Sequence, residues 1–127
     1  DIQGFPKGYE TLVGERGVTL SGGQKQRVSI ARALVRNTPI LILDDSLSAV
    51  DTRTEREILG HIDAYLKDRT SIVITHKVLS LSGFDRIVVL DEGRIAETGT
   101  HNQLLQQGGI YADMYKSQLT QDDREAV

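Results

Sequence analysis

The stretch LSGGQKQRVSIARAL, at residues 20–34, decides how the rest of the chain is interpreted. Ser21 and Gln24 have the S-x-x-Q spacing of a capping box, which predicts a helix beginning directly after Ser21. Gly22 and Gly23 fall in the first turn, where each glycine costs roughly 1 kcal/mol relative to alanine. Because glycines leave the first backbone N–H groups open at the positive end of the helix dipole, the stretch predicts an anion site. An ordinary capped helix is the alternative.

Helical and extended patterns alternate along the remaining sequence. Apolar residues recur at helical intervals in some segments, and in others they form short continuous runs bounded by proline or acids. In chain order we expect a loop at 1–19, a helix at 22–36, a strand at 40–43, a helix at 52–67, a strand at 71–75, a short helix at 78–81, hairpin strands at 86–90 and 93–97, helices at 101–107 and 110–119, and a frayed polar tail from 120. We expect the strand at 40–43 to be buried on both faces of a parallel sheet. The predicted fold class is α/β with a mainly parallel core.

Composition narrows the classes of function. The sequence has 127 residues, enough for one domain at most, and it begins at Asp1, so we expect a piece of a longer chain. It contains no cysteine, which excludes disulfides and cysteine-based metal sites. A net charge of −3 argues against a nucleic-acid-binding surface, and no apolar run approaches the roughly 18 residues of a membrane span. We therefore expect this piece to be soluble and cytosolic.

Two acidic residues, Asp44 and Asp45, directly follow the strand predicted at 40–43. Ligands of open parallel sheets bind beyond the carboxyl ends of the strands, so these carboxylates fall where a site is expected. Mg²⁺ that is already bound to phosphates needs one or two carboxylates of this kind. Asp45 could instead orient a water for attack on a phosphoryl group. Solvated turn acids remain the alternative.

A histidine, His76, directly follows the strand predicted at 71–75, as the two aspartates follow theirs. Its ring could hydrogen-bond a phosphate or a water, although a surface histidine is an equally good interpretation of this residue alone. Because Asp44 and Asp45 also follow a strand, we predict that His76 and this acidic pair belong to one site. We interpret His61 and His101 as structural.

In their order and spacing, these motifs resemble those of the second half of an ATP-binding-cassette (ABC) ATPase domain. Residues 20–24 match the LSGGQ signature, and residues 40–44 look like the Walker B strand and its metal-side aspartate. Residues 48–51, SAVD, resemble the D-loop, with Val50 where leucine is usual. His76 stands at the position of the switch histidine.

The resemblance implies a fold and a division of the chain. The fold would be the C-terminal part of a RecA-like P-loop NTPase, with a mainly parallel sheet, flanking helices and a C-terminal β-hairpin. Residues 1–119 would be the C-terminal portion of the ATPase domain, followed by a polar tail at 120–127. Within that portion, residues 1–36 would end the helical subdomain and residues 37–119 would belong to the core.

The resemblance also implies roles for individual residues. Asp44 would hold Mg²⁺, Asp45 would occupy the position of the catalytic base, and His76 would contact the γ-phosphate of ATP and position water. The signature would contact ATP held by the opposite subunit, and the D-loop would communicate across the dimer. The residues of these two groups are Ser21, Gly22, Gly23, Gln24, Ser48 and Asp51. Taken alone, Asp51 is equally well interpreted as the cap of the next helix.

Further segments resemble ABC exporters in particular. Residues 11–17, TLVGERG, are similar to the TxVGERG segment that contacts transmembrane coupling helices, and residues 85–95 and 99–101 resemble the exporter C-terminal pattern. The resemblance therefore implies a subunit that couples ATP to the export of a drug, lipid or peptide. Its partners would be a transmembrane domain and a second ABC ATPase domain, head to tail in a homo- or heterodimer. It would work at the cytoplasmic face of the plasma (inner) membrane, without nucleic acid.

The sequence departs from the family pattern at the P-loop. No G-x-x-x-x-G-K-[ST] motif occurs in the 127 residues. We expect the P-loop strand of the family to lie between the strands at 40–43 and 71–75, so that this piece lacks the centre of its sheet. The expected consequence is that the 127 residues alone are neither a stable domain nor an active ATPase.

Asp45 is the second departure, because the family usually has glutamate at this position. The shorter side chain sets the carboxylate back by about 1.5 Å, one carbon–carbon bond. Misplacement on that scale can lower a rate on the order of a hundredfold. The chain thus resembles the degenerate-site half of a heterodimeric multidrug exporter. The alternatives are a nucleotide-binding regulatory half with little hydrolysis, and a soluble ABC-type ATPase that acts on DNA or ribosomes.

Overall fold

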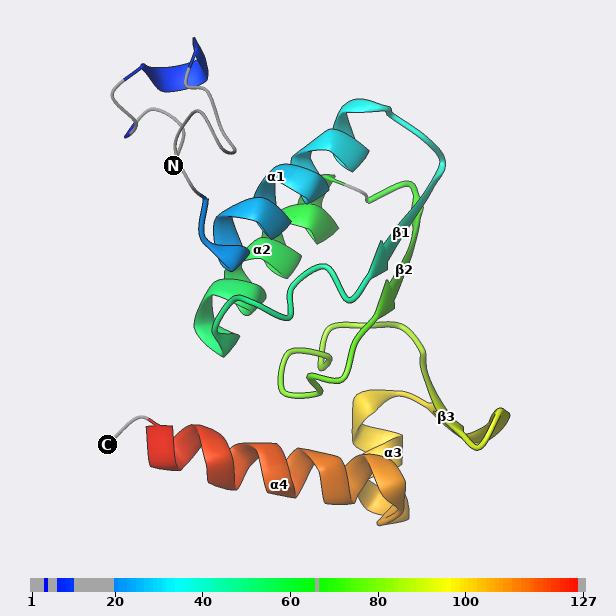
Figure 1. Cartoon of the computed structure of the whole chain (residues 1–127). Helices are drawn as coiled ribbons and strands as arrows, with labels where there is room; N and C mark the ends of the chain where they lie inside the picture. The colour runs from blue at the N-terminus through cyan, green and yellow to red at the C-terminus, as the bar shows by residue number, and fades with distance from the viewer. Residues whose placement is uncertain (1–3, 5–6, 11–19, 66, 126–127) are drawn as a thin grey trace. The chain divides into compact units, whose positions relative to one another are not determined.

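Figure 1 shows the computed structural model, which describes residues 4, 7–10, 20–65 and 67–125. Its elements are η2 (Gly8–Glu10), α1 (Gly22–Val35), β1 (Ile40–Asp44), α2 (Thr52–Tyr65), β2 (Thr70–Ile74), β3 (Ile87–Asp91), β4 (Arg94–Gly99), α3 (His101–Gln107) and α4 (Ile110–Glu125). The chain divides into a first compact unit, Asp1–Asp51 with His61–Thr75, and a second, Thr52–Gly60 with His76–Val127. None of the helices in the described ranges is long and apolar enough to cross a membrane.

Helix α1 of the first unit begins and ends as the sequence predicts. The Ser21 hydroxyl accepts a hydrogen bond from the Gln24 backbone N–H at 3.1 Å. The Gln24 side chain accepts one from the Ser21 N–H at 3.0 Å, which completes the capping box. The chain leaves the helix at Asn37, whose φ of 53° is left-handed, and Pro39 follows shortly after.

Strands β1 and β2 of the first unit pair directly and in parallel. Ile40 lies opposite Thr70 and Asp44 opposite Ile74, and the Asp45 N–H extends the ladder by donating to the Ile74 carbonyl at 2.8 Å. The expectation that a P-loop strand separates these two strands is therefore wrong. Their main-chain hydrogen bonds join them to each other and leave no position for a third strand between them.

The β1–β2 sheet is buried on one face only. Leu41 and Leu43 are 5% and 3% exposed, whereas Ile40 and Ile42 on the opposite face are 53% and 59% exposed. The expected burial of this strand on both faces is wrong. A strand is buried on both faces only where packed layers cover each side, and the described residues cover the leucine face alone.

Strands β3 and β4 of the second unit form the predicted antiparallel hairpin. The turn residues Glu92 and Gly93 have φ values of 49° and 75°, a left-handed pair that is typical of tight hairpin turns. Helix α3 contacts both β4 and α4 (Figure 1). The buried core of this unit consists of Val78, Leu81, Ile87, Val89, Leu104 and Tyr111.

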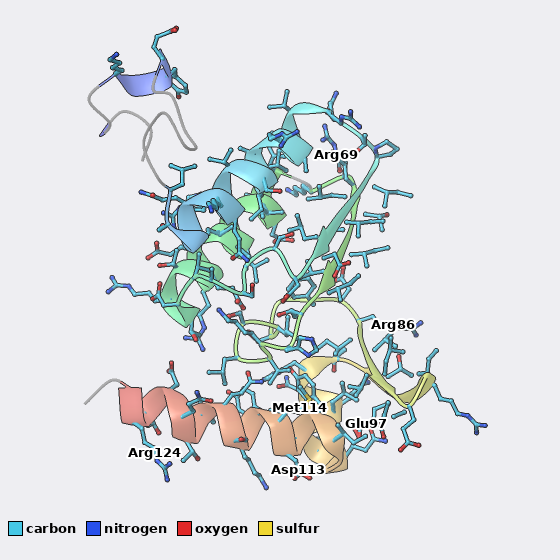
Figure 2. All side chains as sticks on the ribbon, viewed as in Figure 1. Arg69, Arg86, Glu97, Asp113, Met114 and Arg124 are labelled. Carbon is cyan, nitrogen blue, oxygen red and sulfur yellow. The ribbon has the colours of Figure 1, made fainter. Side chains whose placement is uncertain are left out.

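Helix α4 is capped by a side chain from another element. The Glu97 carboxylate on β4 accepts hydrogen bonds from the backbone N–H groups of Ile110 and Tyr111, at 2.9 and 3.0 Å. Glu97 is only 9% exposed, and Figure 2 shows it beside the first turn of α4. A Cβ atom at Gly109 would overlap this carboxylate, which explains why glycine precedes the helix. Two of the N–H groups that a helix start leaves unsatisfied are thus bonded.

Two predicted elements differ from the observed ones. Residues 79 and 80 form a turn where a helix over 78–81 was expected, and the carbonyls of Val78 and Leu79 accept hydrogen bonds from the Tyr111 hydroxyl and the Arg56 Nη2. Helix α4 continues to Glu125, beyond the end expected at residue 119. Residues 120–125 contain no glycine or proline that would stop a helix.

Candidate functional site

The predicted anion site lies at the start of α1, in the first unit. The Ser21 and Gln24 side chains hydrogen-bond to each other's backbone, so they are occupied in forming the helix start. The N–H groups of Gly22 and Gly23 belong to the first turn, where no helix carbonyl can accept from them. An anion at this end of the helix would therefore meet two backbone donors and the positive end of the helix dipole.

The two glycines have a second role that the sequence did not reveal. A Cβ atom at Gly22 would lie 3.1 Å from the Ala49 Cβ, and one at Gly23 would lie 3.2 Å from the Val50 Cγ1. The segment predicted as the D-loop thus packs against the first turn of α1. Glycine is needed here for the close approach of this segment as well as for open N–H groups.

Gln26 joins the same two segments through hydrogen bonds. Its Nε2 donates to the Ser48 hydroxyl at 2.7 Å, and its Oε1 accepts from the Ala49 backbone N–H at 2.8 Å. Gln26 was not among the residues predicted from the sequence. It lies four residues after Gly22 and therefore on the same face of α1, which is the one signal that could have identified it.

The acidic pair lies at the carboxyl end of β1, where the sequence predicts it. Both Asp44 and Asp45 are exposed. Asp45 has a left-handed φ of 52°, a conformation that aspartate adopts more readily than most residues. The Gln26 Nε2 lies 3.5 Å from the Asp45 carbonyl, so the glutamine reaches from α1 to both ends of the 45–49 segment.

The acidic pair suits a magnesium ion that is carried by phosphates. Mg²⁺ bound to substrate phosphates usually takes one or two protein carboxylates and retains water, so Asp44 supplies a donor of the right kind. Within the described ranges no group of three or more His, Cys, Asp or Glu side chains forms a metal cage. The carboxylates at the end of β1 are donors of the kind that phosphate-bound Mg²⁺ takes.

His76 follows β2 and belongs to the second unit. Its side chain is exposed, and its backbone carbonyl accepts a hydrogen bond from the Gln118 Nε2 at 2.7 Å. Asp44 and Asp45 belong to the first unit, so the structure does not bring all three residues together in one compact unit. Their assembly into one site stays a prediction.

The remaining predicted residues have simpler surroundings. Asp51 directly precedes α2, the position of a helix cap, and residues 11–17 lie outside the described residues. The His101 Nδ1 lies 2.7 Å from the Tyr111 hydroxyl, and its ring makes edge contacts with Tyr111 and Tyr115. These packed rings agree with the interpretation of His101 as structural.

Burial changes the acidity of one residue in this cluster. Tyr111 is 1% exposed, and this burial, with a smaller contribution from Tyr115, raises the pKa of its phenol to about 12. The hydroxyl therefore remains protonated at neutral pH, and it donates to the Val78 carbonyl at 3.4 Å.

Comparison with known proteins gives one consistent family. Residues 3–48 match the family model described as ABC transporter. The chain is 50% identical over 118 residues to an ATP-dependent lipid A-core flippase of Photobacterium profundum, covering 93% of this chain and 20% of the relative. It is 53% identical over 125 residues to the mitochondrial potassium channel ATP-binding subunit of Xenopus tropicalis, covering 98% and 18%. It is 51% identical over 120 residues to an ATM1-type heavy metal exporter of Novosphingobium aromaticivorans, covering 94% and 20%.

A solved structure agrees with these relatives. The chain superposes on a bacterial Atm1-family ABC exporter with ATP bound at a TM-score of 0.84 and 52% identity, covering 93% of this chain and 21% of that one. The fold and the order of motifs therefore define the C-terminal portion of an α/β NTPase domain. More specifically, the family model that matches residues 3–48 is that of ABC transporters, and the chain matches a partial ABC ATPase domain that spans about one fifth of the length of these relatives.

Proposed function

We propose that this chain is the C-terminal portion of the ATP-binding subunit of an ABC exporter, which couples ATP binding and hydrolysis to transport across a membrane. The relatives named above include an ATP-dependent flippase, an ATP-binding channel subunit and a heavy metal exporter. The transported substrate is a drug, lipid or peptide. The subunit works at the cytoplasmic face of the plasma (inner) membrane, and residues 11–17 contact the transmembrane domain.

The start of α1 carries this proposal. The Ser21 and Gln24 side chains each accept from the backbone N–H of the other residue, so the site offers the N–H groups of Gly22 and Gly23 to an anion. In the family that the chain resembles, this anion is the γ-phosphate of ATP on the opposite subunit. Ser21, Gly22, Gly23 and Gln24 thus complete the ATP site of a second ABC ATPase domain, arranged head to tail.

This chain also contributes residues to an ATP site of its own, at the ends of β1 and β2. Asp44 holds Mg²⁺, which neutralises charge on the phosphates when it is bound. Asp45 stands at the position of the base, and His76 donates to the γ-phosphate and positions the attacking water. Ser48 and Asp51 contact the partner domain across the dimer. We further propose the division of the chain into a helical-subdomain end at 1–36, a core at 37–119 and a polar tail at 120–127.

Replacing Asp45 tests whether this chain is the degenerate-site half of a heterodimer. Asp45→Glu moves the carboxylate about 1.5 Å toward the position usual in the family, and we expect it to raise ATP turnover at this chain's own site by about tenfold or more, measured in the full-length transporter with the partner's site inactivated. Asp45→Asn, which has no basic carboxylate, is the matched control and should not gain turnover. Because Asp45 has a left-handed φ, thermal unfolding is measured beside turnover to detect strain.

Unchanged or lower turnover in folded Asp45→Glu protein would show that Asp45 is not what limits hydrolysis. ATP binding without turnover in either variant would favour the second candidate function, a regulatory half that binds nucleotide only. The aspartate at the base position is the observation that favours this second candidate.

A further inference from the structure

One side chain of α4 holds the backbone on both sides of Lys77, directly after β2. The Gln118 Nε2 donates to the His76 carbonyl at 2.7 Å, and the Gln118 Oε1 accepts from the Val78 N–H at 2.8 Å. The donor and the acceptor of the Gln118 amide are therefore both bonded to the backbone of residues 76–78. Neither an acidic nor a basic side chain could replace it, because the site needs a donor and an acceptor together.

The same stretch is held at further points within the second unit. Val78 is 4% exposed in the hydrophobic core, and its carbonyl accepts from the Tyr111 hydroxyl of α4 at 3.4 Å. From α2, the Arg56 Nη2 donates to the Leu79 carbonyl at 3.2 Å. The chain at Val78 and Leu79 is thus fixed by packing in the core and by hydrogen bonds from α4 and α2. At His76, the backbone carbonyl is held by its hydrogen bond from Gln118.

The His76 ring itself is exposed, so its position depends on the backbone that carries it. Hydrogen bonds to the His76 carbonyl and the Val78 N–H restrict rotation about the φ and ψ angles between these two groups. We infer that Gln118 is a positioning residue, which fixes the backbone of residues 76–78 and thereby aims the His76 ring at the nucleotide. This inference rests on the proposed function, because it requires His76 to act on ATP.

Gln118 is not needed to hold α4 in place. The helix is anchored by Tyr111, which is 1% exposed, by Ala112, which is 2% exposed, and by the Glu97 cap at its first turn. A variant that loses both amide hydrogen bonds but keeps the length of the side chain should therefore keep the helix and free the His76 backbone. Gln118→Met is that variant, and Gln106→Met, at an exposed position on α3, is the matched control.

The experiment uses the full-length transporter and two measurements. In Gln118→Met we expect the Val78 amide to exchange with deuterium at least about tenfold faster, and kcat for ATP at this chain's own site, measured with the partner's site inactivated, to fall by about tenfold with KM nearly unchanged. In a His76→Ala background the same substitution should cause no further loss of turnover, since Gln118 acts through His76. Gln118→Glu keeps the acceptor for Val78 and loses the donor to His76, so its turnover should fall while the Val78 amide remains protected.

Each outcome decides for or against the inference. Unchanged exchange at Val78 in Gln118→Met would overturn the contact itself. Faster exchange with unchanged turnover, or an equal further loss in the His76→Ala background, would overturn the positioning role alone. A parent transporter that binds ATP and never turns it over would instead overturn the proposed hydrolytic function, and the positioning role with it.

Discussion

Glu55 of α2 is a carboxylate that the fold buries almost completely. Its side chain is 2% exposed, and the Lys77 Nζ lies 3.7 Å from its Oε2. Burial raises the pKa of the Glu55 carboxyl, and the Ser80 hydroxyl and the charges of Lys77 and Arg56 offset only part of this effect. The charged form of Glu55 therefore opposes folding.

The raised pKa predicts how stability changes with pH. The folded state holds the Glu55 proton more tightly than the unfolded state, so this residue favours folding below about pH 4.5 and loses that contribution as the pH rises through its higher folded pKa. Glu55→Gln removes the titration. We expect the unfolding free energy of the variant, relative to the parent, to increase between pH 4 and pH 7 in urea unfolding of the complete ATPase domain.

Glu57→Gln is the control for this experiment, because Glu57 is exposed on the same helix and pairs with Arg53, four residues away. If the relative stability of Glu55→Gln instead declined as the pH rose, the charged carboxylate would be stabilising through Lys77, contrary to our interpretation.

At the scale of single residues, local sequence patterns predicted the residues at the strand ends, but they did not identify Gln26 or Gln118. Asp44, Asp45 and His76 follow apolar runs, and ligand sites form at such strand ends, so sequence alone could predict their places. Gln26 and Gln118 act on residues 22 and 42 positions away in the chain. Such contacts depend on how elements pack, which no local pattern of a single sequence contains.

At the scale of elements, the start of α4 depends on β4. The cap comes from Glu97, and the neighbouring Gly109 must lack a side chain for the carboxylate to reach the helix. We predict that Gly109→Ala displaces Glu97 and lowers the unfolding free energy of the complete ATPase domain by about 1–2 kcal/mol, the usual effect of losing a helix cap.

Gly83→Ala is the matched control, since a Cβ atom there has no neighbour within 4 Å, and its effect should stay within about 0.5 kcal/mol. Equal stability of Gly109→Ala and Gly83→Ala would mean that Glu97 does not contribute to the stability of α4.

Elements with strong local signals could be predicted well. The capping box of α1 and the hairpin of strands predicted at 86–90 and 93–97 rest on short-range patterns, and the structure confirms both. Residues 78–81 were expected to be helical, but the carbonyls of Val78 and Leu79 accept hydrogen bonds from Tyr111 and Arg56 on distant helices. Tertiary hydrogen bonds decided the conformation there, against local propensity.

At the scale of the whole molecule, the exposed isoleucine face of β1 and β2 limits stability. Ile40, Ile42, Ile72 and Ile74 are each between 47% and 59% exposed. We predict that the 127 residues alone show no cooperative thermal unfolding by calorimetry, because a sheet with one bare apolar face buries too little surface to offset the entropy of ordering the chain. The complete ATPase domain should unfold cooperatively under the same conditions. A sharp transition in the isolated chain would contradict this prediction.

The packing of Ala49 against Gly22 has a consequence for how this sequence can vary. The two positions share one small volume, since a methyl group at Gly22 would lie 3.1 Å from the Ala49 Cβ. A larger residue at position 49 would press on the first turn of α1 before it touched any other subunit. Natural variants of this chain should therefore keep small residues at both positions, and a change at one is expected to appear only together with a compensating change at the other.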